Sequence, residues 1–168
     1  MPIMDKELTF CEALDIAGAS GTDKTGTYEV YIPQVKNHKG TAIDDSPNNS
    51  CRLFWNCVVE DNDLLAETDG STIKCDLWCH SATGAVDNGS IILTKTITAN
   101  TPTDHPDGTL LFSLPLPAGQ LDQYFEVEFT IGVQTLSTGK VTSWIGGPVQ
   151  QGRPADAVGA GRAALRIT

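Results

Sequence analysis

The amino-acid sequence predicts an all-β protein, an antiparallel β-sandwich of about eight strands with an extended C-terminal arm. Most of the chain consists of short runs in which apolar and polar residues alternate, separated by clusters of Gly, Asp, Asn, Pro and Ser. Helical periodicity is nearly absent, and glycines interrupt the one Ala-rich stretch, residues 155–165. Because no helices are expected to cover a parallel sheet, the sheets should be antiparallel and stacked. Eight strands with long connecting loops suit a jelly roll best.

The first four expected strands are bounded by turn and loop residues. A short strand at 8–11 precedes a loop at 18–26 that is rich in Gly, Ser, Thr and Asp, and a second strand at 27–32 ends at Pro33. A long polar loop, 36–50, then leads to two strands at 52–60 and 72–79. The residues expected to face the core from these two strands are Leu53, Trp55, Cys57, Val59, Ile73, Cys75, Leu77 and Cys79.

The last four expected strands follow the same logic. Residues 90–98 are rich in β-branched side chains, residues 110–114 end at Pro115, and residues 138–145 follow a Ser-Thr-Gly turn. Residues 124–133 alternate most clearly, with Glu126 and Glu128 expected to face solvent. This strand should form the centre of the core through Phe125, Val127, Phe129 and Ile131.

The length of 168 residues suits one domain, which we place at residues 1–145. Residues 146–168 are rich in Gly and Ala and cannot bury enough area to offset the entropy of ordering them. We therefore expect an extended arm that lies along a partner chain. Its arginines, Arg153, Arg162 and Arg166, are the expected contacts, because guanidinium groups pair well with carboxylates and carbonyls.

The charge of the chain is unevenly distributed. The net charge is −10 at pH 7, with the acidic residues concentrated in the expected domain and a basic excess in the arm. An acidic body is repelled by phosphate backbones, so nucleic-acid binding is not expected. No apolar run is long enough to span a membrane, and no apolar signal stretch opens the sequence, so we expect synthesis and retention in the cytoplasm without membrane contact.

The five cysteines, at positions 11, 51, 57, 75 and 79, are interpreted as core thiols rather than as a disulfide framework or a zinc site. Their number is odd. Cys57, Cys75 and Cys79 share the alternation of the core residues around them, whereas structural zinc sites use closely spaced pairs on turns.

No catalytic, cofactor-binding or metal-binding residues are predicted. His38, His80 and His105 are widely spaced, and we interpret them as ordinary surface or loop histidines rather than as the clustered ligands of a cupin-type enzyme. The sequence contains no nucleophile elbow, phosphate loop or dinucleotide fingerprint. We therefore expect a protein that is not an enzyme and that carries no cofactor.

Two tryptophans are candidates for contact with a partner. Trp78 and Trp144 have the opposite alternation to the core residues of their strands and are expected on outer faces. Tryptophan is enriched in subunit interfaces, which is the interpretation we favour. The alternative is that one of them stacks on a sugar, as in a carbohydrate- or receptor-binding β-sandwich.

Three segments resemble the capsid cement, or decoration, proteins of short-tailed bacteriophages. The first is Leu8-Thr9-Phe10 with the Gly/Ser/Thr loop that follows it, and the second is Leu114-Pro115-Leu116-Pro117 leading to 123–127. The third is the closing segment 138–145.

The resemblance implies a jelly-roll fold, trimers on the outer surface of an icosahedral head, and no catalysis. The expected partners are then the major capsid protein and two further copies of this chain. The expected location is the outer capsid surface of a virion assembled in the host cytoplasm, where an acidic protein lies away from the packaged DNA.

Overall fold

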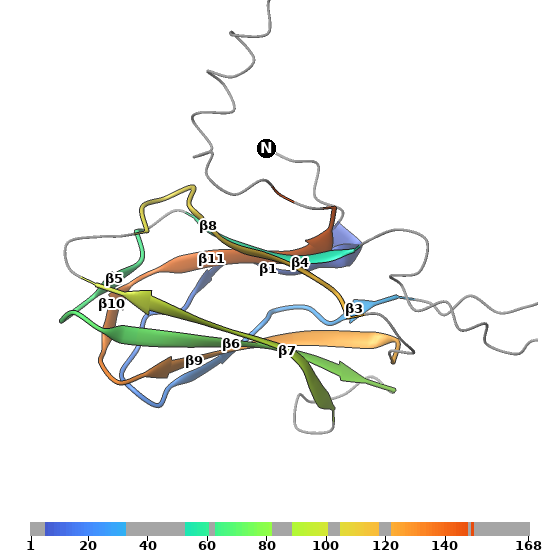
Figure 1. Ribbon diagram of the computed structural model, residues 1–168, viewed down its shortest axis with the longest axis horizontal. Coiled ribbons are helices and arrows are strands. Elements are labelled where there is room, and N and C mark those ends of the chain that lie inside the picture. Colours follow the sequence, from blue (N-terminus) through green and yellow to red (C-terminus); the bar gives the residue numbers. More distant parts are fainter. Residues whose placement is uncertain are drawn as a thin grey trace, which may run out of the picture.

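The computed structural model describes residues 6–32, 53–60, 63–81, 89–100, 105–117, 122–147 and 149, and over these the protein is a sandwich of two antiparallel sheets (Figure 1). The first sheet has the order β1-β11-β4-β8, formed by Thr9–Asp15, Lys140–Gly146, Phe54–Val59 and Leu110–Pro115. The second has the order β2-β9-β6-β7, formed by Asp23–Thr25, Tyr124–Gly132, Ser71–His80 and Ser90–Ala99. The predicted all-β antiparallel sandwich is therefore confirmed.

Smaller elements complete the described structure. β3 (Val30–Tyr31) also pairs with β9, and β5 (Leu65–Ala66) pairs with β10 (Leu136–Thr138). A single turn of 3-10 helix, η1 (Lys6–Leu8), precedes β1. Among the described residues, no helix is long and apolar enough to cross a lipid bilayer.

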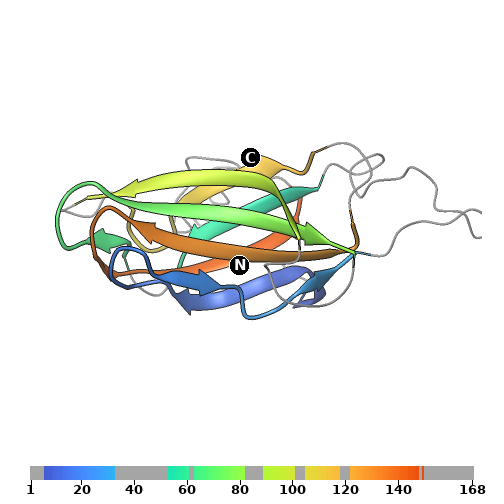
Figure 2. The same cartoon turned by 90° about the horizontal axis from the view of Figure 1, so that it is seen from below.

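The order of the strands is compatible with the predicted jelly roll. Each sheet combines strands from both halves of the chain, and the chain crosses between the sheets repeatedly (Figures 1 and 2). Every segment predicted as a strand overlaps one, and β1 extends four residues beyond the predicted segment, to Asp15. The strands that the sequence did not predict are β2, β5 and β10, which have three residues or fewer. β2 falls in the predicted loop 18–26, because a short polar segment becomes a strand only where β9 offers it an edge.

The core lies between the sheets and matches the predicted alternation. In β9 the side chains of Phe125, Val127, Phe129 and Ile131 are fully buried, and they alternate with partly exposed residues. Ile73, Cys75, Leu77 and Cys79 from β6 are buried against them. In the opposite sheet Trp55 packs edge-to-face against Phe112, with ring centroids 4.6 Å apart.

The domain extends past residue 145, where the sequence placed its end. β11 continues through Gly146, and the Asn56 amide donates a hydrogen bond to the Gly147 carbonyl over 3.2 Å. The amide of Val149 donates to Ser113 Oγ over 3.2 Å. The first residues of the expected arm therefore lie on the outer face of β4 and β8. Arg153, Arg162 and Arg166 lie outside the described residues.

Candidate functional site

The candidate site lies on the outer face of the second sheet, at the end where β9 begins. Because Phe125 and Val127 point into the core, Tyr124 and Glu126 point away from it. The antiparallel register places His80 opposite Tyr124 on the neighbouring strand β6. On the other side of β9, β3 aligns so that Glu29, the residue before it, reaches the same face.

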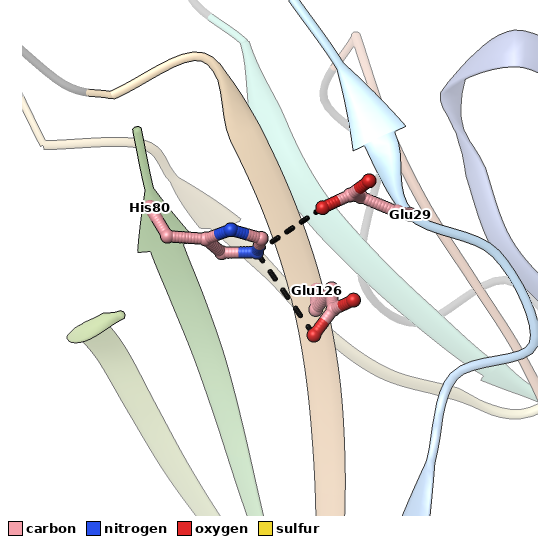
Figure 3. Close-up of side chains that lie close together, drawn as sticks. All are labelled: Glu29, His80 and Glu126. Atoms are coloured by element: carbon pink, nitrogen blue, oxygen red, sulfur yellow. Dashed lines mark ion pairs between the residues drawn. The ribbon is translucent and has the colours of Figure 1, made fainter. Parts of the chain in front are cut away.

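Three side chains meet there, and we call them the His80 cluster: Glu29, His80 and Glu126. His80 Nε2 lies 3.4 Å from Glu29 Oε1 and 3.9 Å from Glu126 Oε2 (Figure 3). The three potential ligand atoms all lie within 4.8 Å of one another. The His80 side chain is 3% exposed, and the side chains of Glu29 and Glu126 are 21% and 16% exposed. An imidazole and two carboxylates thus share a region with little access to water.

Burial and charge both act on Glu126. Burial raises the pKa of its carboxyl above the ordinary value, His80 lowers it, and the neighbouring Glu29 raises it. The Oε2 atom of Glu126 is buried and has no hydrogen-bond partner among the described residues. The arrangement therefore favours a positively charged group between the two carboxylates.

A row of aromatic and apolar side chains crosses the same face, and we call it the aromatic row: Tyr31, Tyr124, Trp78 and Ile91. The Tyr124 ring stacks on His80, with centroids 6.0 Å apart, and lies 4.9 Å from the Tyr31 ring. Trp78 pairs with Ile91 of β7 in the register of the sheet. Tyr31 is 48% exposed and Ile91 is 43% exposed, so part of the row faces solvent.

Trp78 and Trp144, both predicted to lie on outer faces, differ in their exposure to solvent. Trp78 is half-buried within the aromatic row. Trp144 is only 7% exposed, so its predicted role as an outer contact is corrected. The predicted face is correct, because Trp144 lies on the face of β11 away from the core. Its side chain packs close to Gly146.

The interpretation of the histidines is corrected for His80, which is buried at the end of a strand and is neither a surface nor a loop residue. His105 contacts the Thr98 carbonyl through Nε2 at 3.0 Å, and His38 lies outside the described residues. The His80 cluster was not predicted, because its members are distant in the chain and form no sequence motif. The available signal was that His80 and Glu126 both fall on the outward alternation of their strands.

The cysteines behave as predicted where the structure describes them. Cys11, Cys57, Cys75 and Cys79 are free and buried. Burial raises the pKa of the Cys11 thiol to about 12 and that of Cys79 to about 11, and it also raises those of Cys57 and Cys75. These four thiols are components of the hydrophobic core, and Cys51 lies outside the described residues.

Comparison with known proteins gives no match to a protein-family model and no match to a curated protein.

Proposed function

We propose that the protein is a non-enzymatic structural protein of a virion, a jelly-roll cement protein that binds the outer surface of a phage head. The single observation that carries this proposal is the aromatic row on the outer face of the second sheet. Exposed apolar side chains gathered on one face of a rigid sandwich mark a surface for protein contact, and aromatic residues are enriched in such contacts.

The resemblance of the sequence to phage cement proteins supports the choice of binding partners. The major capsid protein and further copies of this chain, in a homotrimer, are the proposed partners. Stabilising a shell in this way requires binding but no catalysed reaction. A protein that binds only the assembled shell stabilises that shell by mass action, because it adds contact area across the seams between capsomers.

The test is co-sedimentation of the full chain with empty heads of the same virus, together with analytical ultracentrifugation of the free protein. Two variants, Tyr31→Ser and Ile91→Ser, remove exposed apolar side chains from the aromatic row. Val133→Ser is the matched control. Val133 is 67% exposed and follows the far end of β9, about 30 Å from Tyr124 at the usual rise of a strand.

We expect the unaltered chain and Val133→Ser to sediment with the heads and to form trimers, whereas Tyr31→Ser and Ile91→Ser lose occupancy or trimers. Absence of head binding by the unaltered chain contradicts the cement proposal. Equal occupancy by all variants shows that the aromatic row is not the contact surface.

A second candidate function is carbohydrate or receptor binding. The observation that favours it is that Tyr31 and Tyr124 lie beside the carboxylates of the His80 cluster, an arrangement that combines a stacking surface with hydrogen-bond acceptors. A glycan array distinguishes the two functions. Reproducible binding that is lost in Trp78→Ala or Tyr31→Ser supports the carbohydrate function, and its absence together with head binding supports cementing.

A further inference from the structure

Potential metal ligands converge at the His80 cluster from three separate strands or strand ends. His80 Nε2 lies 3.4 Å and 3.9 Å from the nearest carboxylate oxygens of Glu29 and Glu126, and all three atoms lie within 4.8 Å of one another. The nearest point that is equidistant from the three atoms is at most about 2.4 Å from each, and zinc bonds to histidine nitrogen and carboxylate oxygen are about 2.0–2.2 Å long. Small rotations of the glutamate side chains bring all three atoms to bonding distance of one ion.

The surroundings of the cluster also suit a cation. The Glu126 Oε2 atom is buried without a hydrogen bond to any residue that the structure describes, and Glu29 places a second carboxylate close to it. Burying carboxylate groups is costly unless a positive charge compensates them. An imidazolium at His80 would balance one of the two negative charges, whereas a divalent ion would balance both.

The mixture of ligands indicates the class of ion. Imidazole nitrogen suits zinc and its neighbours in the first transition row, whereas magnesium and calcium prefer sets made only of oxygen ligands. Two carboxylates with one histidine form a set of three, which in a tetrahedral site leaves a fourth position open. The alternation of β9 directs that position away from the core and toward the outer face of the sheet.

We propose that His80, Glu29 and Glu126 bind one divalent first-row transition metal ion. The site lies on the outside of the sandwich, on the outer face of the second sheet. The Tyr124 ring, which stacks on His80, and the Tyr31 ring, which is tilted against Tyr124, lie beside it on the same face. This proposal does not depend on the cement function, because the ligands belong to one chain.

The experiment is calorimetric titration of the full chain with zinc chloride after removal of metals by EDTA. Glu29→Gln and Glu126→Gln each replace one carboxylate with a neutral amide of the same shape. Glu128→Gln is the matched control, because Glu128 lies on the same face of the same strand two residues beyond Glu126. Circular dichroism spectra verify that each variant retains its sheet structure.

We expect the unaltered chain and Glu128→Gln to bind one zinc ion per chain with equal affinity, and Glu29→Gln and Glu126→Gln to bind at least about tenfold more weakly. The proposal is overturned if the unaltered chain binds no zinc at millimolar concentration. It is also overturned if both cluster variants bind zinc as tightly as the control, since the ion would then be held elsewhere.

A second measurement needs no substitution in the cluster. Long-range proton–nitrogen spectra report the state of each imidazole nitrogen, and His105→Gln assigns the signal of His105. We expect zinc to shift the Nε2 resonance of His80 and to leave that of His105 unchanged. An unchanged His80 resonance at saturating zinc means that zinc does not bind His80, which contradicts the proposal.

Discussion

Single residues in this core show how a polar atom is kept inside a sandwich. Trp55 is fully buried, and its indole N–H donates to Ser143 Oγ over 2.9 Å. The Ser143 hydroxyl donates in turn to the Asn56 carbonyl over 3.1 Å. Because a buried indole N–H needs an acceptor, a small polar residue on β11 allows a large aromatic residue on β4 to be placed in the core.

Substitution of Ser143 tests this contact. Ser143→Ala leaves the buried Trp55 N–H without its acceptor, so we expect the free energy of unfolding to fall by about 1–3 kcal/mol. Urea denaturation measures the change. Ser137→Ala, at an exposed position of β10, should change the free energy of unfolding by less than about 0.5 kcal/mol. Equal effects of the two substitutions would show that the hydrogen bond contributes nothing.

Burial also predicts the reactivity of the thiols. Only the thiolate is nucleophilic, and the raised pKa values of Cys11, Cys57, Cys75 and Cys79 keep these groups protonated at pH 8. In a Cys51→Ser variant we expect no reaction with a disulfide reagent in the native state at pH 8, and reaction of four thiols in denaturant. Rapid reaction of any thiol in the native state would contradict the burial of that cysteine.

At the scale of elements, β9 connects the core with the candidate site. One face of this strand supplies Phe125, Val127, Phe129 and Ile131 to the core, and the other supplies Tyr124 and Glu126 to the outer surface. The pairing of β9 with β6 aligns His80, and its pairing with β3 brings Glu29 close. The packing of the inward face therefore fixes the position of the outward side chains.

The two faces of β9 should respond differently to truncation. Phe129 is fully buried, so Phe129→Ala should lower the free energy of unfolding by about 3–5 kcal/mol, as aromatic truncations in cores do. Glu128→Ala, on the opposite face, should cost less than about 1 kcal/mol. Parallel urea melts give both values, and similar costs would mean that the assignment of the faces is wrong.

At the scale of the whole molecule, residues before and after position 145, the predicted end of the domain, belong to the sandwich. β11 lies between β1 and β4, so the first and last described strands are neighbours in one sheet. The contacts of Gly147 and Val149 with Asn56 and Ser113 extend the domain beyond that strand. Residues 150–168 follow, and their three arginines remain the proposed contacts with a partner chain.

A deletion of residues 150–168 separates folding from partner binding. The shortened chain retains every described strand and the contacts of Gly147 and Val149 with the sandwich. We therefore expect the Tm to change by no more than about 2–4 °C, which corresponds to ~1 kcal/mol in a domain of this size. If the arm contacts a partner, the truncated chain should lose trimers or occupancy of empty heads in a competition assay. Full occupancy by the truncated chain would exclude a role of the arm in binding.

The sequence by itself determined the class of the fold, the approximate positions of seven of the eight strands that form the two main sheets, and most of the core. The physical reason is that alternation with a period of two is a local property, visible in runs such as 124–133, and it specifies which side chains a sheet must bury. The burial of Cys57, Cys75 and Cys79 followed from the same alternation.

The tertiary structure decided which outward residues meet and which are covered. Alternation assigns Trp78 and Trp144 to outer faces alike, but in the folded protein Trp144 is buried and Trp78 is half-buried. The His80 cluster depends on the pairing of β6 and β3 with β9, and the members of the cluster are too distant in the chain to form a motif. Pairing between strands is a non-local property, so the candidate site became visible only in the folded protein.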